Sequence, residues 1–190
     1  MRLTWRRYST LIVMLLSLLA SPVRAIADAT TPWILIDAEQ QTLSVIKNGE
    51  IQVRFYDISI GRGGKGMLRT VGDAKTPVGE FHIAWINRDS RYRKFFGLDF
   101  PNLDYAARAY ENNLIGWNDY IAIRTAILEG RTPPQDTRLG GHIGIHGIGR
   151  DGNRNIHHRF NWTDGCIALT DQQVDALAEW VNLGTTVVIQ

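Results

Sequence analysis

Short apolar segments with the length of β-strands, separated by turn-forming residues, fill the first half of this 190-residue sequence. Residues 33–37 (WILID) and 42–47 (TLSVIK) combine β-branched and alternating apolar positions, as strands do. The dipeptide Asn48-Gly49 favours the two-residue turn of a β-hairpin and joins the second segment to residues 51–60. The pattern therefore restricts this half of the chain to β structure.

The second half mixes helices with further strands. The expected elements are a loop at 61–76, a strand at 80–87, a polar irregular stretch at 88–94, helices at 104–112 and 118–129, a strand at 142–146, a helix between Thr170 and Gly184, and a strand at 185–189. The two middle helices form one insertion at 101–135, and Thr170 with Gln173 predicts a capping box for the last helix. We expect a single mostly β domain, sandwich-like, with a C-terminal helix and a helical insertion.

The N-terminus has the layout of a secretory signal peptide. Three arginines within the first seven residues precede the apolar run at 11–20, and the small-x-small triplet Ala25-Ile26-Ala27 follows. An uncleaved membrane anchor is the alternative, but the run is shorter than the roughly 20 residues that span a bilayer. We expect a signal peptide at 1–27 and a mature, exported chain at 28–190 without a membrane span.

The basic character of the whole chain belongs to this N-terminal segment. Four of the 21 basic residues and none of the 19 acidic residues lie in residues 1–27, so the mature chain has a net charge of −2. It contains no basic stripe interleaved with aromatic residues. We therefore expect no nucleic-acid partner.

Cys166 is the only cysteine, so no intramolecular disulfide stabilises the fold. A lone thiol in an exported protein is either buried and inert or retained because its thiolate performs chemistry. Its neighbours favour chemistry. Gly165 before it leaves room for a substrate carbonyl, and Thr163 is suited to shape the turn.

His146 is the candidate partner of this thiol. It ends an alternating segment, where a loop could bring its imidazole within hydrogen-bond reach of Cys166. The backbone N–H of Cys166 and an adjacent amide lie just before the capped helix and are natural donors for an oxyanion. Cys166 and His146 are thus the predicted catalytic residues.

Other polar residues have a functional and a structural interpretation. His142 is expected on the same side of its strand as His146, where it either orients that residue and contacts substrate or is merely structural. Arg150 and Arg159 are candidates for binding substrate carboxylates, although loop arginines are often simply exposed. The adjacent His157 and His158 are expected at a solvated or substrate-lining surface.

Two blocks of the sequence resemble the L,D-transpeptidases with a YkuD-type catalytic domain. They are His146-Gly147 and, after a short gap, the segment 163–166 (TDGC), and residues 72–81 (GDAKTPVGEF) are similar to an upstream family segment. The resemblance implies a periplasmic enzyme whose cysteine attacks a diaminopimelate carbonyl in a peptidoglycan stem peptide and forms a thioester. We expect no cofactor and no metal, and Gly147, which belongs to the first block, is a candidate for binding or orienting substrate.

Ala168 departs from the commonest family pattern, which has Arg or Asn at this position. The form seen here is closer to a branch that includes an amidase releasing an outer-membrane lipoprotein from peptidoglycan. Transfer to an amine acceptor is therefore the first hypothesis. Hydrolysis, by an amidase or L,D-carboxypeptidase acting on stems or on lipoprotein–peptidoglycan linkages, is the alternative.

Two hypotheses from other classes remain. His142, His146 and Cys166 are all acceptable zinc ligands, although no Cys-x-x-Cys or acidic spacing supports a metal site. A wall-binding module that merely retains its cysteine is the second. Failure of the thiol to react with an electrophile would favour that module.

Overall fold

The computed structural model describes residues 30–190. The predicted signal peptide at 1–27 and the predicted start of the mature chain at Asp28 lie outside the described residues, and both stay predictions. Among the described residues, no helix is long and apolar enough to cross a membrane.

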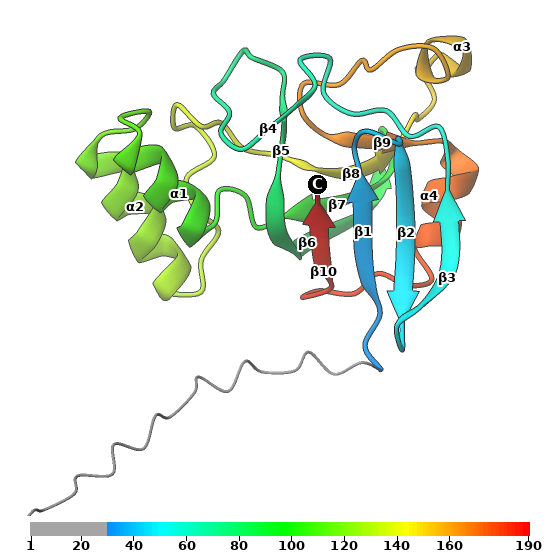
Figure 1. The fold of residues 1–190 in the computed structure, drawn as a ribbon, viewed down its shortest axis with the longest axis horizontal. Coiled ribbons are helices and arrows are strands. Elements are labelled where there is room, and N and C mark those ends of the chain that lie inside the picture. The colour runs from blue at the N-terminus through cyan, green and yellow to red at the C-terminus, as the bar shows by residue number, and fades with distance from the viewer. Residues whose placement is uncertain (1–29) are drawn as a thin grey trace, which may run out of the picture.

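One mixed eight-stranded sheet forms the body of the molecule (Figure 1), in the order β3-β2-β1-β10-β6-β7-β8-β9. Its strands are β1 (Trp33–Asp37), β2 (Thr42–Lys47), β3 (Glu50–Phe55), β6 (Gly79–Ser90), β7 (Arg93–Leu98), β8 (Gly144–Gly147), β9 (Ile167–Leu169) and β10 (Thr186–Ile189). The pairs β1–β10 and β8–β9 are parallel, and the other neighbours are antiparallel. A small second sheet pairs β4 (Lys65–Gly66) with β5 (Thr76–Pro77).

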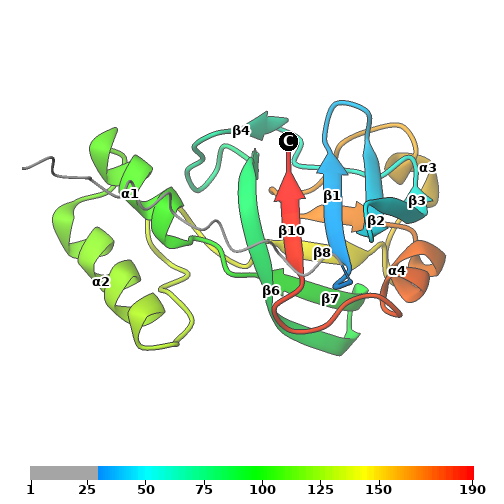
Figure 2. The same ribbon diagram turned by 60° about the horizontal axis from the view of Figure 1, so that its bottom comes forward.

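The long strand β6 belongs to both halves of the large sheet. Residues 79–82 pair with β10, and the residues from Ile83 onwards pair with β7, with a register shift between Ile83 and Trp85. Such irregularities bend a strand, and in Figure 2 β7 and β8 run across the direction of β1 and β10. Ser59 then pairs with Ala168 of β9 through two backbone hydrogen bonds of 2.9 and 2.8 Å. The folded-over sheet confirms the mostly β, sandwich-like fold class.

The hydrophobic core lies between the two halves of the folded-over sheet. Burial in this core accounts for the apolar positions along the strands. The fully buried apolar side chains of the core come from both halves, and they include Ile34, Ile36, Leu43, Phe81, Phe96, Ile145, Ile167 and Val187. Burial of this apolar surface is the main force that holds the sheet in its folded-over form. The predicted hairpin is present as well, because Asn48 and Gly49 adopt φ values of 55° and 76°, as a two-residue turn requires.

Four helices occur among residues 30–190: α1 (Leu103–Glu111), α2 (Trp117–Leu128), α3 (Arg154–His157) and α4 (Asp171–Leu177). Helices α1 and α2 confirm the predicted insertion and lie together at one side of the sheet (Figure 1). Helix α1 buries Tyr105 and two alanines against the core. Helix α4 begins with the predicted capping box, in which Thr170 and Gln173 bond to each other's backbone.

Several boundaries differ from the sequence-based expectation, and one of them is the end of the strand expected at 51–60, which lies at Phe55. The stretch 88–94 was expected to be irregular, but it is the tip of a hairpin between β6 and β7. Its polar residues are largely exposed, so they show no apolar alternation. The strand expected at 142–146 begins at Gly144, because His142 has a φ of 55°. Helix α4 ends at Leu177, although Val181 beyond it is still buried.

Candidate active site

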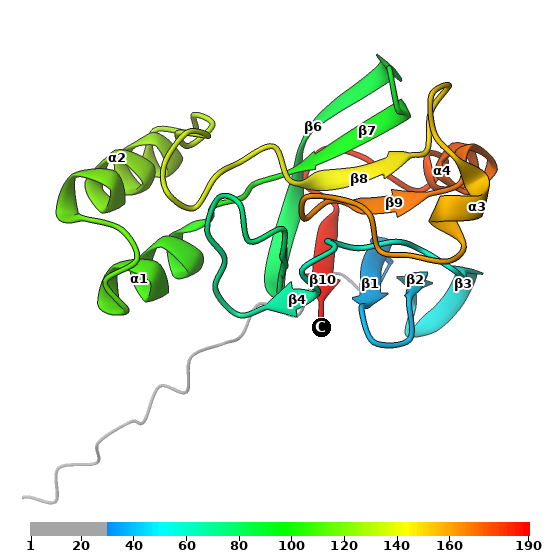
Figure 3. The ribbon, with the colours of Figure 1, turned by 90° about the horizontal axis from the view of Figure 1, so that it is seen from above.

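The pairing of β8 with β9 brings Cys166 and His146 to one face of the sheet. His146 pairs with Ala168 in a parallel register. Cys166 immediately precedes β9, and extending the alternation of that strand by one residue puts its side chain on the same side as His146. The thiol lies beside the segment that leads into β8 and donates to the carbonyl oxygen of His142 at 3.4 Å. Figure 3 shows β8 and β9 side by side.

The turn before the cysteine is held by Thr163, which is buried. Its hydroxyl donates to the Cys166 carbonyl at 2.6 Å and accepts the Gly165 N–H at 3.2 Å. Gly165 has a φ of 127°, and a Cβ there would lie 2.6 Å from the carbonyl oxygen of Lys75. Only glycine fits this position. Because the Gly165 N–H is already bonded, the backbone N–H of Cys166 is the remaining candidate for an oxyanion donor in this turn.

The imidazole of His146 is buried and has a defined tautomer. Its Nδ1 lies 2.7 Å from the Gly147 carbonyl oxygen, which can only accept, so Nδ1 carries the proton and Nε2 is left as a base. Tyr92, Phe95 and Trp162 form an aromatic cage around the ring, at centroid distances of 4.4, 5.6 and 5.9 Å. These three residues were not recognised from the sequence. They come from distant segments, and only Trp162 lies near a motif.

Burial favours the neutral form of both predicted catalytic residues. It raises the pKa of the Cys166 thiol to about 11, opposed by a backbone hydrogen bond at Gly144 and by the positive charge of Arg69. Burial also lowers the pKa of His146, opposed by its bond to Gly147. The resting pair is thus a thiol and a neutral imidazole rather than a preformed ion pair. Within residues 30–190, no hydrogen bond joins the two side chains, a common situation in active sites without substrate.

The other predicted site residues have different surroundings. Gly147 is buried and is therefore not accessible to a ligand. Its N–H donates to the Tyr92 carbonyl oxygen, so it helps to hold Tyr92 beside His146. His142 is exposed, and Gln135 at the end of the insertion accepts its backbone N–H at 2.7 Å. Arg159 is exposed and makes no side-chain bond to any described residue.

Arg150 lines a strongly basic pocket of about 430 Å³ beside the β6–β7 hairpin. The pocket is lined by Arg88, Asp89, Ser90, Arg91, Arg93, Lys94, Gly149, Arg150 and Asp171. Arg93 and Lys94 pair with Asp175, whereas Arg88 and Arg150 have no acidic partner among the described residues. Arg91 also lines a second cavity of about 250 Å³ that includes Tyr92 and Trp162. Arg91 is thus common to the basic pocket and to the cavity lined by Tyr92 and Trp162, two of the rings around His146.

His157 was expected at a surface, but it is buried, and this expectation was wrong. Its Nδ1 accepts the indole N–H of Trp162 at 3.3 Å and lies 3.2 Å from the hydroxyl of Ser59. Because Ser59 pairs with Ala168 beside His146, His157 supports one wall of the cage from behind. The neighbouring His158 is exposed, as expected.

Nothing among the described residues resembles a metal centre. No group of three His, Cys, Asp or Glu side chains converges within residues 30–190, so the proposed zinc ligands His142, His146 and Cys166 do not form such a group.

Comparison with known proteins gives one family and a set of similar folds. The model of the L,D-transpeptidase catalytic domain, YkuD, matches residues 31–189. The helical cell shape determining protein Pgp2 from Campylobacter jejuni is 23% identical at a TM-score of 0.53, covering 86% of this chain and 51% of Pgp2. Bd1075 from Bdellovibrio bacteriovorus is 20% identical at a TM-score of 0.54, covering 87% of this chain and 50% of that protein. No curated protein matches. The chain spans about half the length of these two structures, and the similarity to them is one of fold.

Proposed function

Because this chain belongs to the L,D-transpeptidase catalytic domain family, we propose that it is an exported, periplasmic cysteine enzyme that modifies peptidoglycan stem peptides through a thioester. The observation that carries the proposal is the shared face of Cys166 and His146, with the bond to Gly147 leaving Nε2 of His146 free to act as a base. A nucleophile and a neutral base on adjacent strands are the minimum that acyl transfer requires.

The proposed reaction begins with two neutral side chains. As Sγ of Cys166 attacks the carbonyl carbon of a diaminopimelate residue, Nε2 of His146 takes the thiol proton. The carbonyl oxygen becomes an oxyanion, for which the Cys166 N–H is the candidate donor. His146 then returns the proton to the leaving amine, the C–N bond breaks, and a thioester remains. An amine acceptor that attacks the thioester gives a cross-link, and water gives cleavage.

Stem peptides carry several carboxylates, and the basic pocket offers a matching surface. Arg88 and Arg150 have no acidic partner there, and guanidinium groups bind carboxylates in bidentate geometry. We assign this pocket to stem carboxylates. The insertion at 101–135 reaches the site through Gln135, which bonds the backbone of His142 beside the thiol. This contact supports a role of the insertion in substrate selection.

Hydrolysis is the second candidate, and Ala168 favours it. This residue pairs with His146 and is fully buried, so the side chain offers no hydrogen bond or charge to an acceptor. Water needs no acceptor pocket. The proposed hydrolase cleaves stem peptides or lipoprotein–peptidoglycan linkages as an amidase or L,D-carboxypeptidase.

The deciding experiment incubates the purified chain with muropeptides, with and without lipoprotein-linked peptide, and analyses the products by mass. A diaminopimelyl amine in excess serves as acceptor. New cross-links that rise with acceptor concentration support transfer. Shortened stems or freed lipoprotein without any cross-link support hydrolysis. Cys166→Ala removes both activities and keeps the fold because no disulfide is lost, and turnover by this variant refutes the thioester mechanism. Binding of muropeptides without any product points to the wall-binding module.

A further inference from the structure

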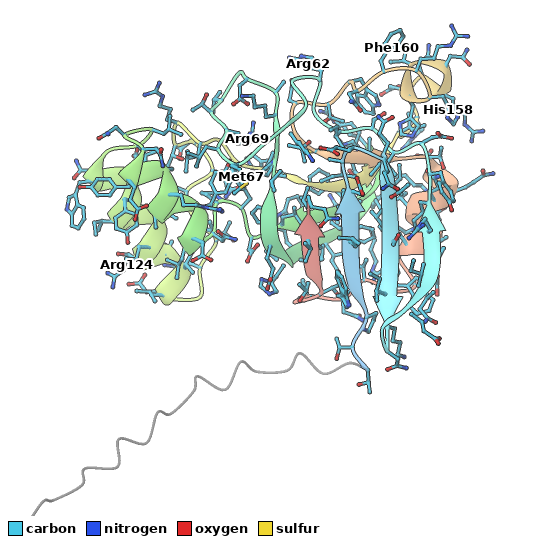
Figure 4. The ribbon with its side chains drawn as sticks, viewed as in Figure 1. Arg62, Met67, Arg69, Arg124, His158 and Phe160 are labelled. Carbon is cyan, nitrogen blue, oxygen red and sulfur yellow. The ribbon has the colours of Figure 1, made fainter. Side chains whose placement is uncertain are left out.

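Arg69 is a buried charged residue that the proposed mechanism does not use. It lies in the segment between β4 and β5, and only 5% of its surface is exposed. Its Nη2 donates to the carbonyl oxygen of Asp164, in the turn that precedes the cysteine, at 3.2 Å. In Figure 4, Arg69 lies lower than Arg62 and closer to the body of the molecule.

The positive charge of Arg69 is only partly neutralised. Its Nε and Nη1 are buried and have no hydrogen-bond partner among the described residues. The closest carboxylate oxygen, Oδ1 of Asp73, is 3.9 Å from Nε and accepts the backbone N–H of Lys75, while the other oxygen accepts that of Thr70. The guanidinium also lies over the ring of Phe100, 5.6 Å from its centroid. Burying a cation whose N–H groups lack hydrogen-bond partners lowers the stability of the folded protein. This cost suggests that Arg69 is retained for its function.

The guanidinium packs against the residue that precedes the nucleophile. A Cβ built on Gly165 would lie 3.4 Å from Cζ of Arg69, so the guanidinium lies close to this glycine. Arg62 also binds Asp164, but at its carboxylate, with a 2.6 Å ion pair whose side chains are 59% and 79% exposed. Solvent and the paired carboxylate screen Arg62, whereas Arg69 acts through the protein interior.

We propose that Arg69 is a positioning residue that fixes the Asp164–Gly165 turn and, with its buried positive charge, stabilises the thiolate of Cys166 as the proton leaves. The inference deepens the proposed function, since Arg69 is the only buried Lys or Arg side chain within residues 30–190, and it adjoins the turn before the half-buried thiol. The direction in which Arg69 shifts the thiol pKa agrees with this role. The other charged residues around the turn are Asp73, Asp164, Arg62 and Lys75, the last of which packs its carbonyl oxygen against Gly165.

The test measures the rate at which iodoacetamide alkylates Cys166 at pH 8, a reaction that needs the thiolate but no turnover. The single cysteine makes the signal unambiguous. Removing an adjacent opposite charge shifts a pKa by about one unit or more, so Arg69→Met slows alkylation about tenfold. Arg69→Lys recovers most of the rate because it keeps the charge. Arg62→Met, the matched control, stays within about twofold of wild type because its charge is exposed and paired.

Thermal unfolding shows whether each variant is folded. In urea, where the chain is unfolded, we expect Cys166 to be alkylated at the same rate in all variants. Equal rates for wild type and Arg69→Met, or equal slowing by Met and Lys, overturn the electrostatic role. If Arg69→Met does not fold, Asp73→Asn decides: it leaves Arg69 less neutralised, so alkylation rises by about twofold, and no rise overturns the proposal. If the wild-type protein forms no product from muropeptides, the proposed function is refuted. The alkylation rates do not depend on turnover, so they still test the role of Arg69.

Discussion

The turn before Cys166 rests on one buried hydroxyl, and Thr163→Val tests its contribution. Valine has the shape of threonine but removes both the bond to the Cys166 carbonyl and the bond from the Gly165 N–H. A buried polar group left without a partner costs about 1–3 kcal/mol, so we expect the two groups to cost about 3 kcal/mol together. For a domain of this size, that lowers the melting temperature by about 6–12 °C.

Thermal unfolding followed by circular dichroism measures the change, with Thr163→Ser as the variant that keeps the hydroxyl. Thr132→Val is the matched control, because Thr132 is exposed and makes no hydrogen bond to a described residue. We expect both to melt close to the wild-type protein. If Thr163→Val also melts within about 2 °C of it, the hydroxyl does not hold the turn, and the reasoning fails.

Three further predictions concern the rest of the molecule. Ala168→Asn, which restores a residue common in the family, lowers stability by about 2 kcal/mol because the site is fully buried, and equal urea midpoints would contradict this. Burial lowers the pKa of His157 from 6.5 to about 4. Between these pH values the unfolded chain binds a proton at His157 and the folded protein does not, so the free energy of unfolding falls as the pH drops from 6.5 to 4. His157→Asn flattens this profile in urea titrations, and a profile as steep as that of the wild-type protein would contradict this assignment. N-terminal sequencing of exported protein finds a start near Asp28, and a chain that retains residues 11–20 would show an anchor instead.

Local features of the fold were predictable because their causes are local. The turn dipeptide Asn48-Gly49 and the pair Thr170 and Gln173 act over four residues or fewer, and each has one favoured geometry. The β6–β7 hairpin was not predictable, because its polar tip lacks alternation and its pairing depends on β8 and β10. The positive φ of His142 has no sequence signal.

In the candidate active site as well, some residues were predictable from local motifs and others were not. Cys166 and His146 lie in motifs whose spacing points to their chemistry, whereas the surroundings that tune them come from distant segments. Arg69 is nearly 100 residues before the cysteine it adjoins, and a loop arginine is ordinarily exposed. His157 is buried beside Ser59, which lies about 100 residues earlier in the sequence, and beside Trp162. Tertiary contacts of this kind leave no periodic trace in the sequence.

The place of β10 in the sheet makes folding depend on the last residues of the sequence. Residues 186–189 lie between β1 and β6, so the centre of the sheet stays open until nearly all of the preceding residues have been made. Until then β1 and β6 each present an unpaired edge that invites aggregation. Pairing of residues 34–36 with 187–189 also closes a very long loop, which slows folding. A chain truncated before residue 186 is therefore expected to remain unfolded.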